Sequence, residues 1–389
     1  MPGRIVLYGA TGYMGTLTAR ALVASGTRPV LAGRDQGRLD ALAARLAGEH
    51  GTALETAVAG TETAGPLRDL LGAGDVLVST AGPFTRIGQA AVTAAVQAGA
   101  IYLDSSGEPP FIRRVFEEFG PRAERTGAVL LTAFGYDYVP GNLAGALALQ
   151  SAGPDATRVR VGYFVRAKLG KATSAGTRAS VAGVLLKPGY AFRGGRLVTE
   201  RTAAHVASFE IDGARREALS IGSSEHFALP RLRRLALSAD GTAAAAPLAD
   251  VGVYLGWFGA ATRLVHYVSA LAGTLDALPG VRRLLEREAD RIQRSRAAPV
   301  PGNPMRSDVV AVAADDRGKT LATVHLTGED PYSFTAPMLA WAARGAAAHG
   351  VRGPAAEGAP RAGALGPAEA FGLAELQSAC ANAGFVVHP

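Results

Sequence analysis

The chain has 389 residues, more than one hydrophobic core usually supports, so we expect two domains. Hydrophobic residues make up 48% of the chain and charged residues 19%, which excludes a disordered protein and is typical of a globular one. The single cysteine, Cys380, excludes an internal disulfide and a zinc site built from several cysteines. We therefore expect a cytoplasmic protein without a metal centre.

The net charge of +7 comes from basic residues that are spread along the chain. This distribution favours anionic small molecules or an acidic carrier protein as partners and disfavours nucleic acid. The most apolar stretch, residues 251–275, contains Arg263 and His266, which argue against a helix that spans a membrane. We expect an amphipathic or buried helix there that could line an apolar substrate site. Peripheral contact with a membrane and a homodimer both stay open.

A glycine-rich turn close to the first residue predicts a nucleotide site. The apolar run Ile5–Tyr8 has the composition of a buried strand, and residues 16–23 have helical spacing. Between them, Gly9 allows a sharp turn, Gly12 allows close approach of a pyrophosphate, and Gly15 allows the helix to pack on the strand. The predicted cofactor-binding residues of this turn are Gly9, Ala10, Thr11, Gly12, Tyr13, Met14 and Gly15. The alternative is a glycine turn that only connects a strand to a helix.

The end of the second predicted strand, residues 29–32, indicates which dinucleotide is preferred. Arg34 stands where a cation would bind the 2′-phosphate of NADP, and Arg38 lies one turn into the next predicted helix. Asp35 would instead suit the ribose hydroxyl of NAD. We expect NADP (NADPH), with Arg34 as a cofactor-binding residue. The alternative is that Arg34 is an arginine of an exposed loop.

Further strands predicted over residues 75–80, 101–104 and 128–133 alternate with helices, which predicts a doubly wound parallel sheet, an α/β fold. Ligands bind at the carboxyl ends of such strands. The small residues after the first of these strands would let a cofactor lie against the backbone. The predicted cofactor-binding residues of these loops are Thr80, Ala81, Gly82, Pro83 and Asp104. Asp104 and Glu108 are expected to hold loop backbone or cofactor hydroxyls.

Beyond about residue 150 the pattern changes to that of a second, α+β domain with a mixed sheet. We expect domains at residues 1–148, 149–330 and 331–389, the last formed by C-terminal helices. The clearest secondary elements are strands over residues 158–165, 196–202, 207–211, 233–237, 308–314 and 320–327, and helices over 178–186, 281–296, 332–348 and 367–383. Residues 350–366 are expected to form a flexible link.

Several motifs in this order resemble those of the saccharopine dehydrogenase-like oxidoreductases, in the branch of the actinobacterial trans-acting enoyl reductases. They are the glycine turn, Ser79–Phe84, Tyr102–Asp104 with Gly107–Glu108, Phe134–Pro140, and Gly328–Tyr332 with Thr335–Ala336. The resemblance implies a Rossmann domain that binds NAD(P), a mixed-sheet domain, and C-terminal elements that return to the first domain. Tyr138 and the pair Gly141–Asn142 depart from the family pattern, which leaves the substrate open. The amino-acid-binding arginines of saccharopine enzymes have no match, so a lysine-pathway activity is disfavoured.

The loop that contains Tyr136, Asp137 and Tyr138 holds the candidate catalytic residues. Hydride transfer from a nicotinamide needs a proton donor for the atom that gains charge. Either phenol could donate, and Asp137 could orient one of them or bind the ribose, although both tyrosines could also be packing residues. No tyrosine and lysine stand four residues apart, which argues against a short-chain dehydrogenase.

We expect an NADPH-dependent reductase of an electrophilic C=C bond in an acyl or polyketide-like intermediate of specialised or lipid metabolism. The substrate would be a small molecule or carrier-bound. An imine or carbonyl reductase, a cyclase without net redox chemistry, and a catalytically silent NADP-binding protein are the alternatives.

Overall fold

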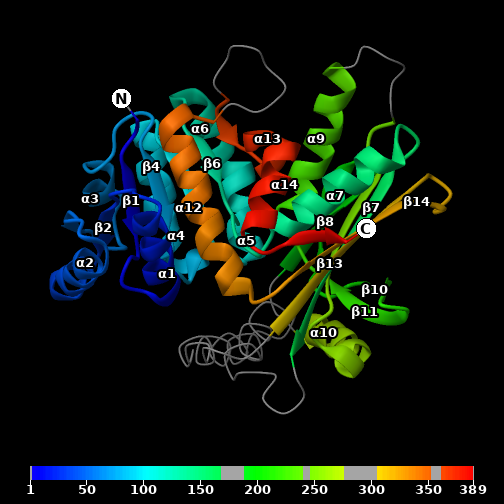
Figure 1. Ribbon diagram of the computed structural model, residues 1–389. Helices are drawn as coiled ribbons and strands as arrows, with labels where there is room; N and C mark the ends of the chain where they lie inside the picture. Colours follow the sequence, from blue (N-terminus) through cyan, green and yellow to red (C-terminus); the bar gives the residue numbers. More distant parts are fainter. Residues whose placement is uncertain (1, 168–187, 240–245, 276–304, 352–360, 389) are drawn as a thin grey trace. The chain divides into compact units, whose positions relative to one another are not determined.

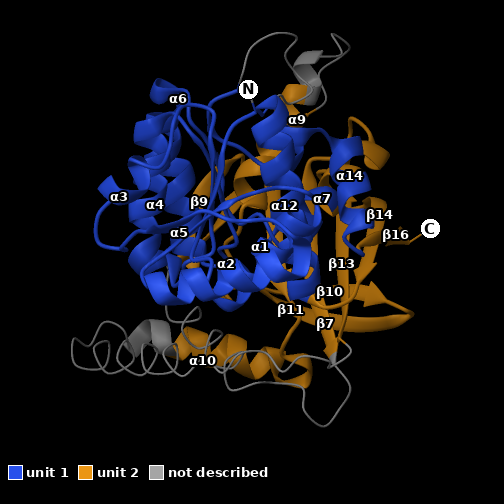
Figure 2. Cartoon of the chain, turned by 60° about the vertical axis from the view of Figure 1, so that its left-hand side comes forward, with its two compact units in different colours: residues 1–143, 331–384 blue, residues 144–330, 385–389 orange. Residues whose placement is uncertain are grey.

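The computed structural model describes residues 2–167, 188–239, 246–275, 305–351 and 361–388. Within these ranges the chain divides into two compact units (Figure 2). The first contains residues 1–143 and 331–384, and the second contains residues 144–330 and 385–389. The first boundary therefore lies five residues before the predicted one, and the last five residues belong to the second unit. The helices predicted over residues 178–186 and 281–296 lie outside the described residues.

The first unit is built on a seven-stranded parallel sheet with the strand order β15-β6-β5-β4-β1-β2-β3 (Figure 1). Its central strands are short and buried along their whole length, because helices cover both faces of a parallel sheet. The strands are β1 (Ile5–Tyr8), β2 (Val30–Gly33), β3 (Thr56–Val58), β4 (Val76–Ser79), β5 (Ile101–Asp104), β6 (Val129–Leu131) and β15 (Gly363–Ala364). This sheet confirms the prediction of a doubly wound Rossmann fold.

Helices pack on both faces of this sheet. On one face α12 lies beside α1 and contacts β1, β4 and β5, whereas α4 packs on β4 and β5 and contacts α3, α5 and α6. The helices are α1 (Tyr13–Ala24), α2 (Gln36–His50), α3 (Gly65–Arg68), α4 (Phe84–Ala98), α5 (Pro109–Arg114), a π-helical turn (Val115–Phe119), α6 (Gly120–Thr126), α7 (Val139–Ala152), α12 (Pro331–His349), α13 (Pro367–Phe371) and α14 (Leu373–Asn382). Helix α7 crosses from the first unit into the second.

The second unit contains a nine-stranded mixed sheet, as predicted for the α+β domain. Its main path is β10-β11-β12-β7-β13-β14-β16, and β8 pairs with β12 and β9. Only β12 and β7 pair in parallel. The strands are β7 (Arg158–Ala167), β8 (Pro188–Arg193), β9 (Arg196–Arg201), β10 (Val206–Ile211), β11 (Ala214–Ser220), β12 (Asp250–Leu255), β13 (Met305–Ala314), β14 (Thr320–Gly328) and β16 (Val386–His388). Helices α9 (Glu225–Ala239) and α10 (Thr262–Leu275) and a 3₁₀ turn (Gly259–Ala261) accompany them.

One sequence-based assignment was wrong, and two others differ from the structure over part of their range. The stretch 233–237 belongs to α9, where the guanidinium of Arg233 donates to the carbonyl oxygens of Gly153, Pro154 and Ala156. The apolar stretch 251–275 is divided between the buried strand β12 and the helix α10. Residues 352–360 of the predicted link lie outside the described residues, but at its end β15 pairs with β6 and extends the parallel sheet. In each case contacts with residues far away in the sequence decide the local structure. None of the described helices has the length and apolar character needed to cross a membrane.

Candidate functional site

The carboxyl ends of β1 and β4 form the switch point of the parallel sheet. The chain leaves β1 toward β2 and leaves β4 toward β5, so the two connections diverge and leave a crevice where such folds bind ligands. Tyr8 and Ser79 are paired in register at the ends of these strands. The Thr80 hydroxyl lies 3.1 Å from the carbonyl oxygen of Tyr8 and 3.2 Å from that of Gly9. The structure thus brings together the two predicted loops, Gly9–Gly15 and Thr80–Pro83.

The three glycines of the first loop differ in what surrounds them. Gly9 has φ +79°, and a Cβ there would lie 2.8 Å from the amide nitrogen of Ala81. A Cβ on Gly15 would overlap the carbonyl oxygen of Gly9. Gly12 is exposed, and a Cβ there would meet only the Gly9 carbonyl oxygen, at 3.2 Å. Close packing therefore requires Gly9 and Gly15, whereas Gly12 presents bare backbone to a ligand.

Helix α1 begins at this loop with an open N-terminus. Its N-cap residue, Gly12, makes no side-chain hydrogen bond, and its first turn contains no acidic residue. Within the described chain, the amide groups of Met14 and Gly15 have no acceptor. Free amides and the positive end of the helix dipole together attract an anion. The loop therefore has the form and charge that a pyrophosphate needs.

The N-terminus of the neighbouring helix α4 is closed, because a carboxylate caps its first amide groups. The Glu108 carboxylate accepts hydrogen bonds from the amides of Phe84, at 2.8 Å, and Thr85, at 3.0 Å, and from the Thr85 hydroxyl. Glu108 comes from the loop after β5, so it ties that loop to the Ala81–Pro83 turn. This agrees with the expectation that Glu108 holds loop backbone. The turn itself contains a cis peptide bond between Gly82 and Pro83.

Arg34 and Arg38, which are predicted to select the cofactor, both follow β2. Arg34 is exposed at the end of β2, and Arg38 donates a hydrogen bond of 3.2 Å to the carbonyl oxygen of Thr11 in the glycine turn. The Asp35 side chain caps α2 by accepting from the Arg38 amide at 3.0 Å. Because this capping engages its carboxylate, Asp35 is less suited to binding the ribose of NAD. The arrangement favours a phosphorylated ribose.

A groove of about 440 Å³ lies beside the glycine turn, between α1 and α2. Three arginines line it: Arg20, Arg38 and Arg45. Arg20 pairs with Glu49 at 3.3 Å. Arg20 and Arg45 were not predicted from the sequence, although the seven-residue spacing of Arg38 and Arg45 places them on one face of a helix. The groove increases the positive potential around the glycine turn.

Asp104 is completely buried beneath the carboxyl edge. Its Oδ1 accepts from the amides of Ser106, at 2.8 Å, and Ala133, at 2.9 Å. Burial raises the pKa of Asp104 to about 6, although these two hydrogen bonds oppose that shift. Asp104 therefore braces the loops that follow β5 and β6. This agrees with the expectation that Asp104 holds loop backbone. Its Oδ2 is buried without a hydrogen-bond partner in the described part of the chain, and the predicted contact with a cofactor stays a prediction.

The loop of the candidate catalytic residues is held against α12. A Cβ on Gly135 would lie 2.6 Å from Cγ2 of Thr335, and the Thr335 hydroxyl accepts from the Tyr136 amide at 3.0 Å. Two motifs about 200 residues apart are thus neighbours within the first unit. Tyr136 is 3% exposed and Tyr138 1% exposed, so both rings are packed in the interior. The Asp137–Tyr138 peptide bond is cis.

The carboxyl group of Asp137 is buried in this loop with one oxygen that accepts no hydrogen bond within the described chain. Its Oδ1 is buried without a hydrogen-bond partner in the described part of the chain, and a Cβ on Gly107 would lie 2.7 Å from Oδ2. Burial raises the pKa of Asp137 to about 6. A buried carboxyl group with a pKa near neutrality can hold or release a proton under physiological conditions.

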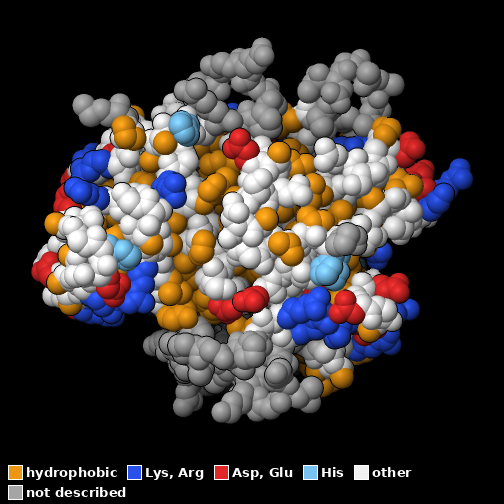
Figure 3. Space-filling model, viewed as in Figure 1, with side chains coloured by type: hydrophobic (Ala, Val, Ile, Leu, Met, Phe, Trp, Pro, Cys, Tyr) orange, Lys and Arg blue, Asp and Glu red, His pale blue; other side chains and the backbone are white. Residues whose placement is uncertain are grey.

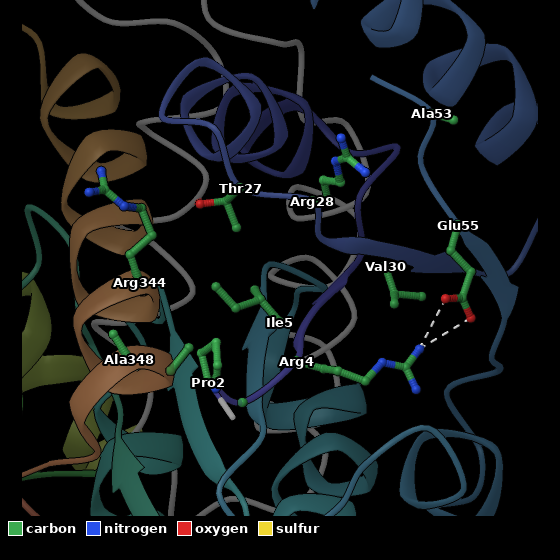
Figure 4. A pocket seen from close by; sticks show the side chains of 12 residues that line it. Pro2, Arg4, Ile5, Thr27, Arg28, Val30, Ala53, Glu55, Arg344 and Ala348 are labelled. Atoms are coloured by element: carbon green, nitrogen blue, oxygen red, sulfur yellow. Dashed lines mark hydrogen bonds and ion pairs between the residues drawn. The ribbon is translucent and has the colours of Figure 1, made fainter. Parts of the chain in front are cut away.

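A second hollow, of about 540 Å³, lies at the opposite, amino edge of the same sheet (Figure 4). Its lining includes Arg4, Glu55, Arg28 and Arg344. Arg4 and Glu55 form an ion pair at 3.1 Å, and the guanidinium groups of Arg28 and Arg344 do not point toward each other (Figure 4). This hollow is therefore not a focused anion site.

The second unit contains a buried polar cluster that sequence reasoning missed. At the start of α9, the Tyr163 hydroxyl lies 2.6 Å from Oε1 of Glu225, and the amide of Ser223 donates to Nδ1 of His226 at 3.2 Å. Burial lowers the pKa of His226 to about 3, so its imidazole stays neutral at physiological pH. Four consecutive polar residues, Ser223–His226, between apolar neighbours were the available signal.

Comparison with known proteins identifies the first part of the chain. Residues 5–131 match the saccharopine dehydrogenase NADP binding domain. This match confirms the predicted resemblance over those residues and the prediction of an NADP-binding domain. It covers the glycine turn, Arg34, the Thr80–Pro83 loop and Asp104, but not the loop of Asp137.

Two similar proteins are trans-acting enoyl reductases of Mycobacterium leprae (strain TN) and Mycobacterium ulcerans (strain Agy99), 39% and 37% identical over 141 residues. Each alignment spans 36% of this chain and 34% of the relative, so the chain matches about a third of the length of these relatives. The chain is also similar to a solved structure of a variant meso-DAPDH with DAP from Clostridium tetani E88. The alignment covers 93% of each chain at 12% sequence identity, and the TM-score is 0.41.

Proposed function

We propose that this protein is an NADPH-dependent reductase that acts on an electrophilic C=C bond of an acyl or polyketide-like substrate, free or bound to a carrier. The open N-terminus of α1 at the Gly9–Gly15 turn carries this proposal, because it lies in the region that matches an NADP binding domain. The names of the two mycobacterial relatives support the choice of an enoyl substrate.

The residues around the glycine turn fit the cofactor. The Gly12 backbone and the open amides of α1 would hold the pyrophosphate, and Arg34 and Arg38 would hold the 2′-phosphate. Thr80 fixes the second loop against the first, which keeps the crevice in shape before binding. Bound NADPH supplies a hydride.

We propose that Asp137 holds a proton in this site and donates it during the reduction. Its buried Oδ1 can hold a proton at a pH near 6, and an acid of this kind can protonate the carbon or heteroatom that gains charge during reduction. Tyr136 and Tyr138 flank it, and the hydrogen bond from the Tyr136 amide to Thr335 fixes the loop. We assign the tyrosines a positioning role because both rings are buried.

A substrate panel tests the proposed reaction. The purified protein is mixed with NADPH and, separately, with an enoyl thioester, a ketone and a cyclic imine, and NADPH absorbance is followed. We expect oxidation with the enoyl thioester, and mass spectrometry should show deuterium from labelled NADPH at the β-carbon of the product. Turnover confined to the ketone or the imine would assign the alternative reductase activity. NADPH binding without turnover of any substrate would indicate a silent binding protein.

A further inference from the structure

Helix α10 of the second unit packs with its polar side against residues 201–203 of the same unit. The buried hydroxyl of Ser269 donates to the carbonyl oxygen of Thr202 at 2.8 Å, and Nδ1 of His266 lies 2.8 Å from the carbonyl oxygen of Ala203. Arg201 donates to the Ser269 hydroxyl at 2.8 Å from the same side. Thr262, Ser269 and His266 lie on one side of the helix, because they are spaced by three, four or seven residues. These contacts fix the rotation of the helix.

The opposite side of α10 is apolar and exposed. Leu264 is 66% exposed, Tyr267 67% and Val268 56%, and Leu271, 62% exposed, continues the same helical spacing. These four residues make up half of the large hydrophobic residues that are exposed in the described chain. We call them the α10 stripe. A soluble amphipathic helix normally buries such a stripe, so this orientation, held by specific hydrogen bonds, indicates an external apolar partner.

The charge of the chain is concentrated in the same unit. Residues 144–330 contain 25 of the 40 basic residues and 17 of the 33 acidic ones, so this stretch has a net charge of +8 and the rest of the chain −1. Helix α10 contains no acidic residue. Its single arginine, Arg263, has a side chain that is 71% exposed and pairs with Glu217 of β11 at 2.7 Å. In Figure 3, hydrophobic side chains lie close to both basic and acidic side chains in the lower right part of the surface, where Figure 1 places α10.

We propose that the α10 stripe docks on an anionic lipid surface. An apolar stripe on a helix without acidic residues, in a unit of net positive charge, matches the interfacial boundary of such a membrane. A second copy of the chain is a poorer match, because a stable interface buries about 800 Å² on each partner, more than four side chains provide. Docking does not depend on the proposed reductase activity. It would place the second unit where lipid-like substrates are dissolved.

Vesicle co-sedimentation tests this proposal. The full-length protein is mixed with vesicles of phosphatidylcholine alone or with added phosphatidylglycerol, at low and high salt. We expect binding to the anionic vesicles that weakens with salt. The triple variant Leu264→Gln/Tyr267→Gln/Val268→Gln should lose about tenfold or more in apparent affinity, because each replaced side chain loses its transfer into the interface. Tyr267→Trp should tighten binding.

The matched control is Val58→Gln/Val386→Gln, which removes exposed hydrophobic residues, 53% and 48% exposed, from two other places. This control should bind vesicles like the natural protein, and circular dichroism should show that all variants fold. No binding to anionic vesicles, or equal binding by the triple variant, would overturn the proposal. The proposal would also be overturned if the natural protein sediments as a dimer and does not bind vesicles while the triple variant is a monomer. The α10 stripe would then be assigned to contact with a second copy of the chain.

Discussion

The N-termini of α1 and α4 both lie at the carboxyl edge of the parallel sheet, but they differ in whether their amide groups are hydrogen-bonded. At the start of α4, the Glu108 carboxylate engages the amides of Phe84 and Thr85. At the start of α1, Gly12 provides no cap, and the amides of Met14 and Gly15 find no acceptor in the described chain. A helix N-terminus without a capping group normally costs stability. The chain therefore keeps one N-terminus available for an anion and neutralises the other.

The carboxylates of this edge divide in the same way. Glu108 and the Oδ1 of Asp104 are bonded to backbone amides, whereas the Oδ2 of Asp104 and the Oδ1 of Asp137 are buried without a partner in the described residues. Unpaired buried polar atoms are costly, and they persist at sites where a ligand or a reaction uses them. We propose that the open amides of α1 and the carboxyl group of Asp137 belong to one functional edge of the sheet.

Gly15→Ala should abolish the open anion site. The added Cβ overlaps the Gly9 carbonyl oxygen, so the turn must shift, and we expect NADPH affinity to fall by about a hundredfold or more in calorimetry. The matched control is Gly48→Ala, because Gly48 also lies in a helix but a Cβ there meets no atom within 4 Å. The control should bind NADPH normally and gain up to about 1 kcal/mol of stability. Equal affinities of the two variants would contradict the assignment.

Asp137→Asn should stabilise the folded protein at alkaline pH while impairing turnover. The pKa of Asp137 is raised from 3.8 to about 6, so the folded state holds this proton more tightly than the unfolded state. The stabilising contribution of the protonated form is complete below pH 3.8 and is lost as the pH rises through 6. Near pH 8, urea titration should show the variant more stable by about 2 kcal/mol, with little difference at about pH 4.

The control for this experiment is Asp316→Asn, which alters an exposed carboxylate of the β13–β14 turn. Its stability should follow that of the natural protein at both pH values. A pH-independent effect of Asp137→Asn would show that the carboxyl group is not strained by burial.

Glu108→Ala should remove the carboxylate that caps the N-terminus of α4. The amides of Phe84 and Thr85 lose their acceptor, which should lower the free energy of unfolding by about 1–2 kcal/mol in urea titration. Glu108→Gln keeps an acceptor oxygen and should lose less. We also expect a higher KM for NADPH in the alanine variant, because the Gly82–Pro83 turn is no longer tied to the loop after β5. Unchanged stability of Glu108→Ala would remove the contrast between the two helices.

Arg34→Ala and Arg38→Ala should each weaken NADPH by about tenfold and leave NADH nearly unchanged, because only NADPH carries the 2′-phosphate. Fluorescence titration with both cofactors measures the ratio. Arg28→Ala removes an exposed arginine at the opposite edge of the sheet and should change neither affinity. Equal losses of NADPH and NADH in the Arg34 variant would refute its role in selectivity.

The sequence alone determined the α/β sheet and the position of the glycine turn. Apolar runs such as Ile5–Tyr8 and the glycines that follow are local signals, because strand burial and turn geometry depend on neighbouring residues. The same reasoning singled out Arg34 and Asp137. It failed for the stretch 233–237 and for β15, where the structure depends on partners more than 70 and more than 200 residues away, respectively.

Which polar groups are hydrogen-bonded and which are left open follows from the way distant segments pack together. Glu108 and Asp137 are both carboxylates in loops after strands, and their sequence neighbours do not reveal which hydrogen-bond donors each of them meets. Their difference arises because Glu108 meets the start of α4, whereas the buried Oδ1 of Asp137 meets no donor in the described chain. The outward-facing stripe of α10 has the same origin, since contacts with Thr202 and Ala203 fix the helix rotation. Hydrogen-bond partners and burial depend on how distant segments meet, which residue spacing along the chain does not encode.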